Sequence, residues 1–194
     1  MCYCNLGPPN GSLLGDLVAN TAIRDLFLDG NNLQCEGACE LITFIADYAE
    51  NMARMKFGAS THFEEDPLTH SLEGKHKQEL PQIAPWLSRL HLTDNSIDGR
   101  GNSSTMGPIM FTEILCQLIK FSDHLTELDL DNNCLGELCG KEILKALRER
   151  KEAKLQSLSI KVTAQMNEDT FSNILNNSKK LKKSKRKKVN NSME

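Results

Sequence analysis

The sequence predicts an α/β solenoid, in which a strand, a turn and a helix recur about every 28 residues. Within 23–45, Leu26 and Leu28 stand at alternate positions between Asp25 and Asp29, and later apolar residues follow at four-residue spacing. The apolar period therefore changes from that of a strand to that of a helix inside one unit. The same spacing returns at 87–101 and at 125–147. One unit cannot bury its own apolar edge, so we expect a right-handed stack with inner parallel strands and outer helices.

The first 22 residues match the second part of such a unit. Counting back from Ile23 places Cys4 at the asparagine position and places Leu14 and Val18 on the helix. Met1 then falls inside the strand, which predicts a truncated first coil with an open edge. Such an edge is expected to continue into a longer array or to dock on a partner; a shortened form that folds poorly is the alternative.

The remaining units follow in chain order, and their boundaries are listed here: a partial unit at 1–22, full units at 23–51, 52–86, 87–124 and 125–154, and a C-terminal cap at 155–178. The unit at 52–86 is degenerate. Met52, Met55 and Phe57 take its strand positions, and a long polar stretch follows them. In the cap, the strand spacing persists and the rest of the pattern is lost, as expected of a terminal unit.

The pattern LxxLxLxxNxLxxxGxxxLxxxL resembles the ribonuclease-inhibitor-like subfamily of leucine-rich-repeat proteins over about residues 1–175. Asn31, Asn95 and Asn133 occupy the asparagine position, and Cys4 takes the equivalent place in the first unit. The resemblance implies a leucine-rich-repeat domain with inner parallel strands and outer α-helices. An inward asparagine is expected to donate hydrogen bonds to backbone carbonyls that the turns would otherwise leave buried without partners.

The composition, with 39% apolar and 25% charged residues, is typical of a globular protein. No stretch approaches the roughly 18 apolar residues of a membrane span, so no span is predicted. The start has no basic region followed by a long apolar block, so no secretory signal is predicted. We therefore expect an intracellular protein, cytoplasmic and/or nuclear.

The seven cysteines are expected to be reduced thiols. Five are interpreted as small buried residues, because they lie close to apolar or asparagine positions of the units: Cys2, Cys4, Cys35, Cys39 and Cys139. The alternative is a metal site built from Cys35 with Cys39, or from Cys134 with Cys139. Neither spacing is the two-residue spacing of a zinc knuckle, so we predict no metal and no cofactor.

The sequence contains no recognisable catalytic arrangement. It has no Ser-His-Asp or Cys-His pattern at a known spacing and no phosphate-binding glycine loop. His62, His70 and His76 lie near acidic residues in a polar stretch, but their irregular spacing favours solvated side chains over a metal cluster. We therefore predict that the chain is not an enzyme.

The strand residues between the inward leucines are expected to form a concave face. They comprise alternating acidic and basic strips with one aromatic residue: Asp25, Phe27, Asp29, Arg54, Lys56, Arg89, His91, Glu127, Asp129 and Asp131. Concave solenoid faces are large and suit protein partners. We predict a noncatalytic protein–protein interaction module or scaffold of unknown partner; the alternatives are a solvated polar face and, from relatives of this repeat class, a regulator that activates a small GTPase.

The C-terminal tail at 179–194 is strongly basic and is expected to be disordered. A short run of lysine and arginine predicts a nuclear localisation signal, formed by Lys182, Lys183, Lys185, Arg186, Lys187 and Lys188. A solubilising tail, or a contact with nucleic acid or an anionic membrane, is the alternative. Residues 1–178 carry 15 basic against 25 acidic side chains, so nucleic acid is not expected to be the main ligand.

Overall fold

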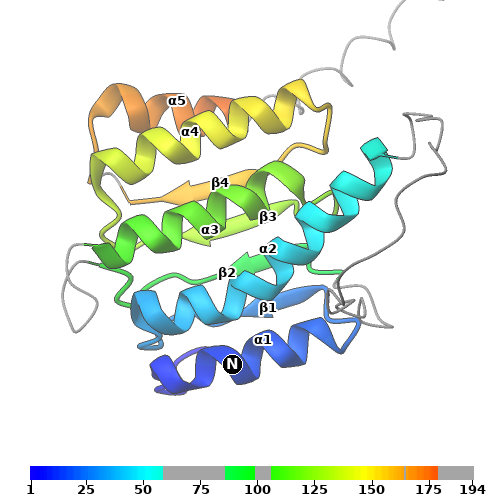
Figure 1. Ribbon diagram of the computed structural model, residues 1–194. Coiled ribbons are helices and arrows are strands. Elements are labelled where there is room, and N and C mark those ends of the chain that lie inside the picture. The colour runs from blue at the N-terminus through cyan, green and yellow to red at the C-terminus, as the bar shows by residue number, and fades with distance from the viewer. Residues whose placement is uncertain (59–85, 99–105, 164, 179–194) are drawn as a thin grey trace, which may run out of the picture.

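The structure is a computed structural model that describes residues 1–58, 86–98, 106–163 and 165–178. Its sheet has four parallel strands that lie side by side in chain order (Figure 1): β1 (Asp25–Phe27), β2 (Arg89–His91), β3 (Glu127–Leu130) and β4 (Ser159–Val162). The described residues also form five α-helices, which follow a short 3-10 helix η1 (Pro8–Asn10): α1 (Gly11–Ala19), α2 (Gln34–Gly58), α3 (Gly107–Phe121), α4 (Gly136–Glu152) and α5 (Glu168–Ser178). The predicted α/β class with a parallel sheet is confirmed.

The core lies between the sheet and the helices, with successive helices in contact along the stack (Figure 1). The strand register aligns Leu26 with Leu90, Leu128 and Ile160, and all four side chains are buried. The residues on either side of these positions point to the opposite face of the sheet, as strand geometry requires. The predicted inward side is therefore confirmed for these four strands. No helix in the part of the chain described here is long and apolar enough to cross a lipid bilayer.

The predicted unit at 52–86 is wrong in its first part, because α2 continues through Gly58. The register pairs Asp25 directly with Arg89, so no strand lies between β1 and β2. The segment AENMARMK is rich in strong helix formers, and Arg54 pairs with Glu50 one helical turn away at 2.6 Å. Residues 23–58 thus belong to one strand–loop–helix unit; 59–85 lie outside the described residues.

Buried asparagines connect the loops that follow the strands. Asn133 donates through Nδ2 to the carbonyls of Leu92 and Leu130 at 2.7 and 3.1 Å, and its Oδ1 accepts from the amides of Asn95 and Ile97, each at 3.1 Å. A short polar side chain therefore satisfies backbone groups of two neighbouring units. The predicted role of the inward asparagines is confirmed at Asn133.

Asn31 makes the equivalent contacts two units earlier. Its Oδ1 accepts from the amides of Cys4 and Leu6, each at 3.0 Å, and its Nδ2 donates to the carbonyls of Met1 and Leu28. The first residues also follow the edge of β1, since the Met1 amino group donates to the Phe27 carbonyl. These contacts hold the first unit against the second.

The loops are of two alternating kinds, distinguished by where the backbone takes a positive φ. The four pairs of positive-φ residues are Tyr3 with Asn5, Gly30 with Gln34, Asp94 with Ser96, and Asn132 with Gly136. The two residues are two apart in the first and third loops, and four apart in the second and fourth. Asn95, in the third loop, donates to the carbonyls of Leu28 and Thr93, but its Oδ1 has no partner among the described residues. The loop geometry therefore decides how many bonds each asparagine makes.

All seven cysteines are free thiols. Cys35 and Cys139 are buried and Cys2 and Cys39 are half-buried, whereas Cys4 is exposed. The prediction that Cys4 is buried is wrong, because its thiol lies at the surface and donates to the Cys2 carbonyl instead. The backbone amide of Cys4, not its side chain, makes the contact with the next unit.

Glu137 attaches α5 to the rest of the fold. Its carboxylate accepts from the Asn167 amide at 2.8 Å and from the Thr170 hydroxyl at 2.9 Å. The Asn167 amide in particular lowers the pKa of Glu137 below its ordinary value. These bonds hold α5 against α4 at the β4 end of the sheet.

We expect Glu137→Gln to loosen α5, because a neutral amide accepts these hydrogen bonds more weakly than a carboxylate. The wild-type contribution is present above the unfolded-state pKa and is lost as the pH falls through the lowered folded-state pKa. Hydrogen exchange should therefore be faster in α5 of the variant near neutral pH, with little change in α1. Equal exchange of α5 in both proteins would contradict this role.

Candidate functional site

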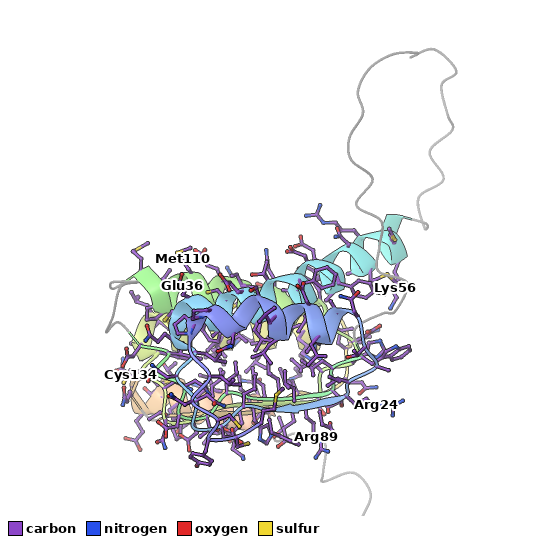
Figure 2. The ribbon with its side chains drawn as sticks, turned by 90° about the horizontal axis from the view of Figure 1, so that it is seen from below. Arg24, Glu36, Lys56, Arg89, Met110 and Cys134 are labelled. Carbon is purple, nitrogen blue, oxygen red and sulfur yellow. The ribbon has the colours of Figure 1, made fainter. Side chains whose placement is uncertain are left out.

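The face of the sheet that points away from the core carries most of the predicted binding residues. We define this open face by its described members: Asp25, Phe27, Asp29, Arg89, His91, Thr93, Glu127, Asp129, Asp131 and Lys161. Figure 2 shows Arg89 projecting from the strands on the side opposite the helices. The face includes eight of the ten residues predicted to bind a partner.

Arg54 and Lys56 do not belong to this face, because both lie on α2. Arg54 binds Glu50 on the same helix, and the Lys56 ammonium group binds the Asp123 carboxylate at 2.6 Å. Their assignment to the concave face is therefore wrong. The error follows from interpreting the end of a long helix as a strand.

Arg89 and Phe27 form one end of the open face. The guanidinium of Arg89 binds both carboxylate oxygens of Asp25, at 2.7 and 2.6 Å, and its central carbon lies 5.4 Å from the Phe27 ring centroid. The Arg89 hydrogen bond lowers the pKa of Asp25. Phe27 is half-buried, so part of its ring is exposed, and the Arg89 guanidinium lies over the ring.

His91 occupies the middle of the open face between two carboxylates. Its Nε2 lies 3.2 Å from Glu127 Oε1, and its Nδ1 lies 3.9 Å from Asp29 Oδ2. The imidazole also packs edge-on against Phe27, with ring centroids 4.5 Å apart. Only Nε2 is within hydrogen-bonding distance of a carboxylate, and it donates to Glu127 in the tautomer that carries the proton on Nε2. These contacts connect three neighbouring strands through one side chain.

Asp129 is the most buried charge on the open face, with 6% of its surface exposed. It accepts from the Lys161 ammonium at 2.6 Å, the Thr93 hydroxyl at 2.9 Å and the Asp131 amide at 3.1 Å. Burial by itself would raise the pKa of Asp129, but these three hydrogen bonds lower it overall. Asp129 therefore orders the face and is poorly placed to meet a partner directly.

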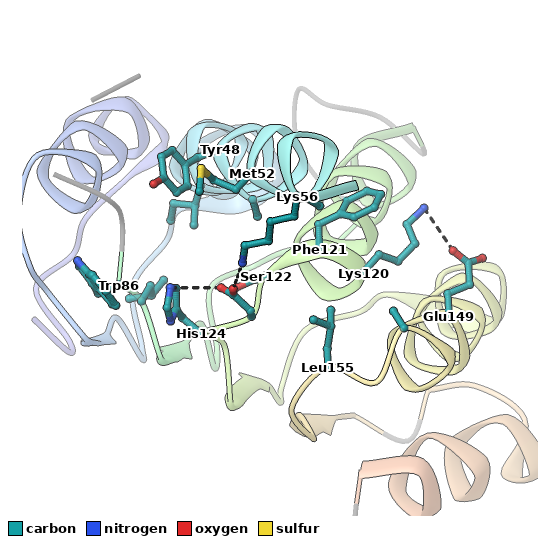
Figure 3. Close-up of a pocket in the computed structure, with 16 residues that line it drawn as sticks. Tyr48, Met52, Lys56, Trp86, Lys120, Phe121, Ser122, His124, Glu149 and Leu155 are labelled. Atoms are coloured by element: carbon teal, nitrogen blue, oxygen red, sulfur yellow. Dashed lines mark hydrogen bonds and ion pairs between the residues drawn. The ribbon is translucent and has the colours of Figure 1, made fainter. Parts of the chain in front are cut away.

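A groove lies at the C-terminal ends of α2, α3 and α4, away from the open face (Figure 3). It has a volume of about 420 Å³, and its apolar lining includes Tyr48, Met52, Trp86 and Phe121. Trp86 packs on the His124 ring at 4.6 Å between centroids. Sequence reasoning missed this groove because its walls come from three separate units. Trp86, the only tryptophan of the chain, was the one residue in the sequence that could have indicated a groove.

The charges around this groove are paired with one another. Asp123 binds both Lys56, at 2.6 Å, and His124, at 3.2 Å, and Lys120 lies 3.7 Å from Glu149 (Figure 3). Burial by itself would raise the pKa of Asp123, whereas the Lys56 hydrogen bond and the His124 charge lower it overall. The groove thus has an apolar floor, and the positive and negative charges around its rim nearly cancel.

The described residues contain no group of three or more metal-ligating side chains. Burial raises the pKa of Cys35 and Cys116 to about 12 and that of Cys39 to about 11. These thiols stay protonated near neutral pH, which makes them weak nucleophiles and weak metal ligands. The predicted histidine-rich stretch and the localisation signal lie outside the described residues and stay predictions.

Comparison with protein-family models and with curated proteins gives no match. The proposals below therefore rest on the geometry of this chain.

Proposed function

We propose that the chain is a leucine-rich-repeat solenoid and a noncatalytic protein-binding module that holds its partner on the open face. The observation that carries this proposal is the network across that face. Arg89, His91 and Thr93 each contact a carboxylate of a neighbouring strand, so the side chains are held in place before a partner arrives. Preorganised side chains lose little conformational freedom on binding.

Two further features support the solenoid assignment. The asparagine contacts of Asn31 recur two units later at Asn133, with equivalent backbone partners. The strands are short and parallel and occur in chain order, as stacked repeats require. A sheet built in this way presents one row of outward side chains from each unit.

A GTPase-activating function has no comparable support. Arg89 is engaged by Asp25 and Arg54 by Glu50, so each candidate arginine already binds a carboxylate. No contact among the described residues favours this alternative. Stimulation of GTP hydrolysis by the purified chain would support it.

The test of the proposed function compares two double variants in cells by proximity labelling. Phe27→Ala with His91→Ala removes the rings of the open face, and Met110→Ala with Leu138→Ala truncates two exposed apolar side chains on the helices. We expect the first pair to reduce labelling of specific partners about tenfold or more, as loss of an aromatic anchor does. The second pair should leave it unchanged.

Thermal melts of both double variants must match that of the wild type, so that unfolding does not account for lost labelling. Equal labelling by the two variants would show that the open face is not the binding surface.

A further inference from the structure

The charge on the open face is unbalanced. It carries five carboxylates, on Asp25, Asp29, Glu127, Asp129 and Asp131, against the two permanent cations Arg89 and Lys161. Arg89 forms an ion pair with Asp25, and Lys161 forms one with Asp129. The face therefore keeps an excess of negative charge after its own ion pairs are formed.

Three carboxylates account for this excess. Among the described residues, Asp29, Glu127 and Asp131 have no lysine or arginine nitrogen within 4.0 Å; His91 is the ionisable base beside Asp29 and Glu127. Asp131 is exposed, and the side chains of Asp29 and Glu127 are 24% and 33% exposed. All three are thus reachable from the solvent side of the sheet.

The half-buried Phe27 ring packs against His91, which lies beside two of these carboxylates, Asp29 and Glu127. The Arg89 guanidinium lies over this ring, with its central carbon 5.4 Å from the ring centroid, so Phe27 already contacts one cation. A partner side chain with a long apolar stem and a charged end would cover Phe27 and reach a carboxylate at once. Lysine and arginine are the side chains with that form.

We propose that the open face docks a lysine- and arginine-rich segment of a second protein. The inference rests on the proposed function and names the chemistry of the partner. Charge complementarity carries it: the segment supplies the cations that Asp29, Glu127 and Asp131 lack, and its apolar stems cover Phe27. The acidic balance of residues 1–178 would also attract such a segment from a distance.

The probe is a fluorescent ten-residue peptide of alternating lysine and serine, with a glutamate–serine peptide as its negative control. Binding to the full chain is measured by fluorescence anisotropy at about 50 mM and about 300 mM salt, where charge screening differs strongly. We expect the lysine peptide to bind at low salt and the glutamate peptide not to bind.

Two triple variants with the same change in net charge locate the site. The open-face variant carries Asp29→Asn, Glu127→Gln and Asp131→Asn, substitutions that keep the oxygen atoms which accept from Thr93 and Thr163. The helix variant replaces three exposed acids of α3 and α4: Glu113→Gln, Glu142→Gln and Glu152→Gln. We expect the first to weaken binding about tenfold or more and the second by about twofold or less.

Equal weakening by both triple variants would show attraction to the acidic body as a whole and would overturn the proposal. Failure of the wild type to bind would also overturn it, while the labelling test with Phe27 and His91 would still decide the proposed function. A full chain with the basic run 179–188 neutralised to glutamine is tested in parallel. If only that variant binds, the chain's own run occupies the face, and the assignment to a second protein is wrong.

Discussion

Replacement of Asn133 by cysteine is expected to destabilise the fold by about 3–5 kcal/mol, whereas the same replacement of Asn95 costs about 1 kcal/mol. Asn133→Cys removes the bonds from Nδ2 to the carbonyls of Leu92 and Leu130. It also leaves the amides of Asn95 and Ile97 without their acceptor in a buried setting. An unpaired buried donor costs more than the net value of its lost bond.

Asn95→Cys is a matched control, because it makes the same chemical change in the other kind of loop. Asn95 Oδ1 accepts nothing in the described structure, so only the two bonds from its Nδ2 are lost. The chain itself places Cys4 at this position in its first loop, which has the same spacing of positive-φ residues.

Urea unfolding followed by circular dichroism measures both free energies of unfolding. The expectation is a clearly lower midpoint for Asn133→Cys than for Asn95→Cys. Equal losses in the two variants would mean that the alternation of loops has no energetic consequence.

Replacement of Arg150 by methionine is the second large effect that we expect, at about 3–5 kcal/mol. Arg150 is 2% exposed, and its guanidinium donates to four backbone carbonyls at 2.6–2.8 Å: those of Ile119, Ser122, Leu125 and Gln156. These carbonyls come from the end of α3, the approach to β3 and the approach to β4. One side chain therefore fixes three segments.

Burial lowers the pKa of Arg150 to about 10, so the group stays protonated at neutral pH. Methionine keeps much of the side-chain length but leaves all four carbonyls without a donor. Lysine keeps the charge, but its three donors on one nitrogen cannot reproduce the planar fork of a guanidinium. We expect Arg150→Lys to lie between the wild type and Arg150→Met.

Thermal and urea unfolding of both Arg150 variants check this order. Arg148→Met, on the exposed side of the same helix, is the control and should change the stability little. A loss for Arg150→Met no larger than that for Arg148→Met would show that the buried guanidinium contributes nothing to stability.

Much of the fold was predictable because it depends on local spacing. The alternation of Leu26 and Leu28, and its return at Leu90, Leu128 and Ile160, placed the inward side of each strand correctly. The candidate site was predicted to the same extent, since the residues between the inward ones must point outward. The pairings between β1 and β2 on that face were not predicted, because the strand expected at 52–57 would have separated these two strands.

The misassigned segment shows the limit of periodicity. Met52, Met55 and Phe57 fit a strand by their spacing, yet the chain continues as a helix through them. An apolar residue every third or second position suits both structures over so short a stretch. Helix propensity and the continuation of an existing helix, which needs no new nucleus, favoured the helix.

The sequence by itself determined the α/β class, the inward faces of the strands and the asparagine positions, since each depends on spacing within about ten residues along the chain. Only the tertiary structure decided that β1 adjoins β2, that Asp25 binds Arg89, and that Arg150 bridges three segments. These contacts join residues far apart in the sequence, and they depend on how whole units pack. Contacts between units produce no repeating pattern of residues within a single unit, so they cannot be predicted from its sequence.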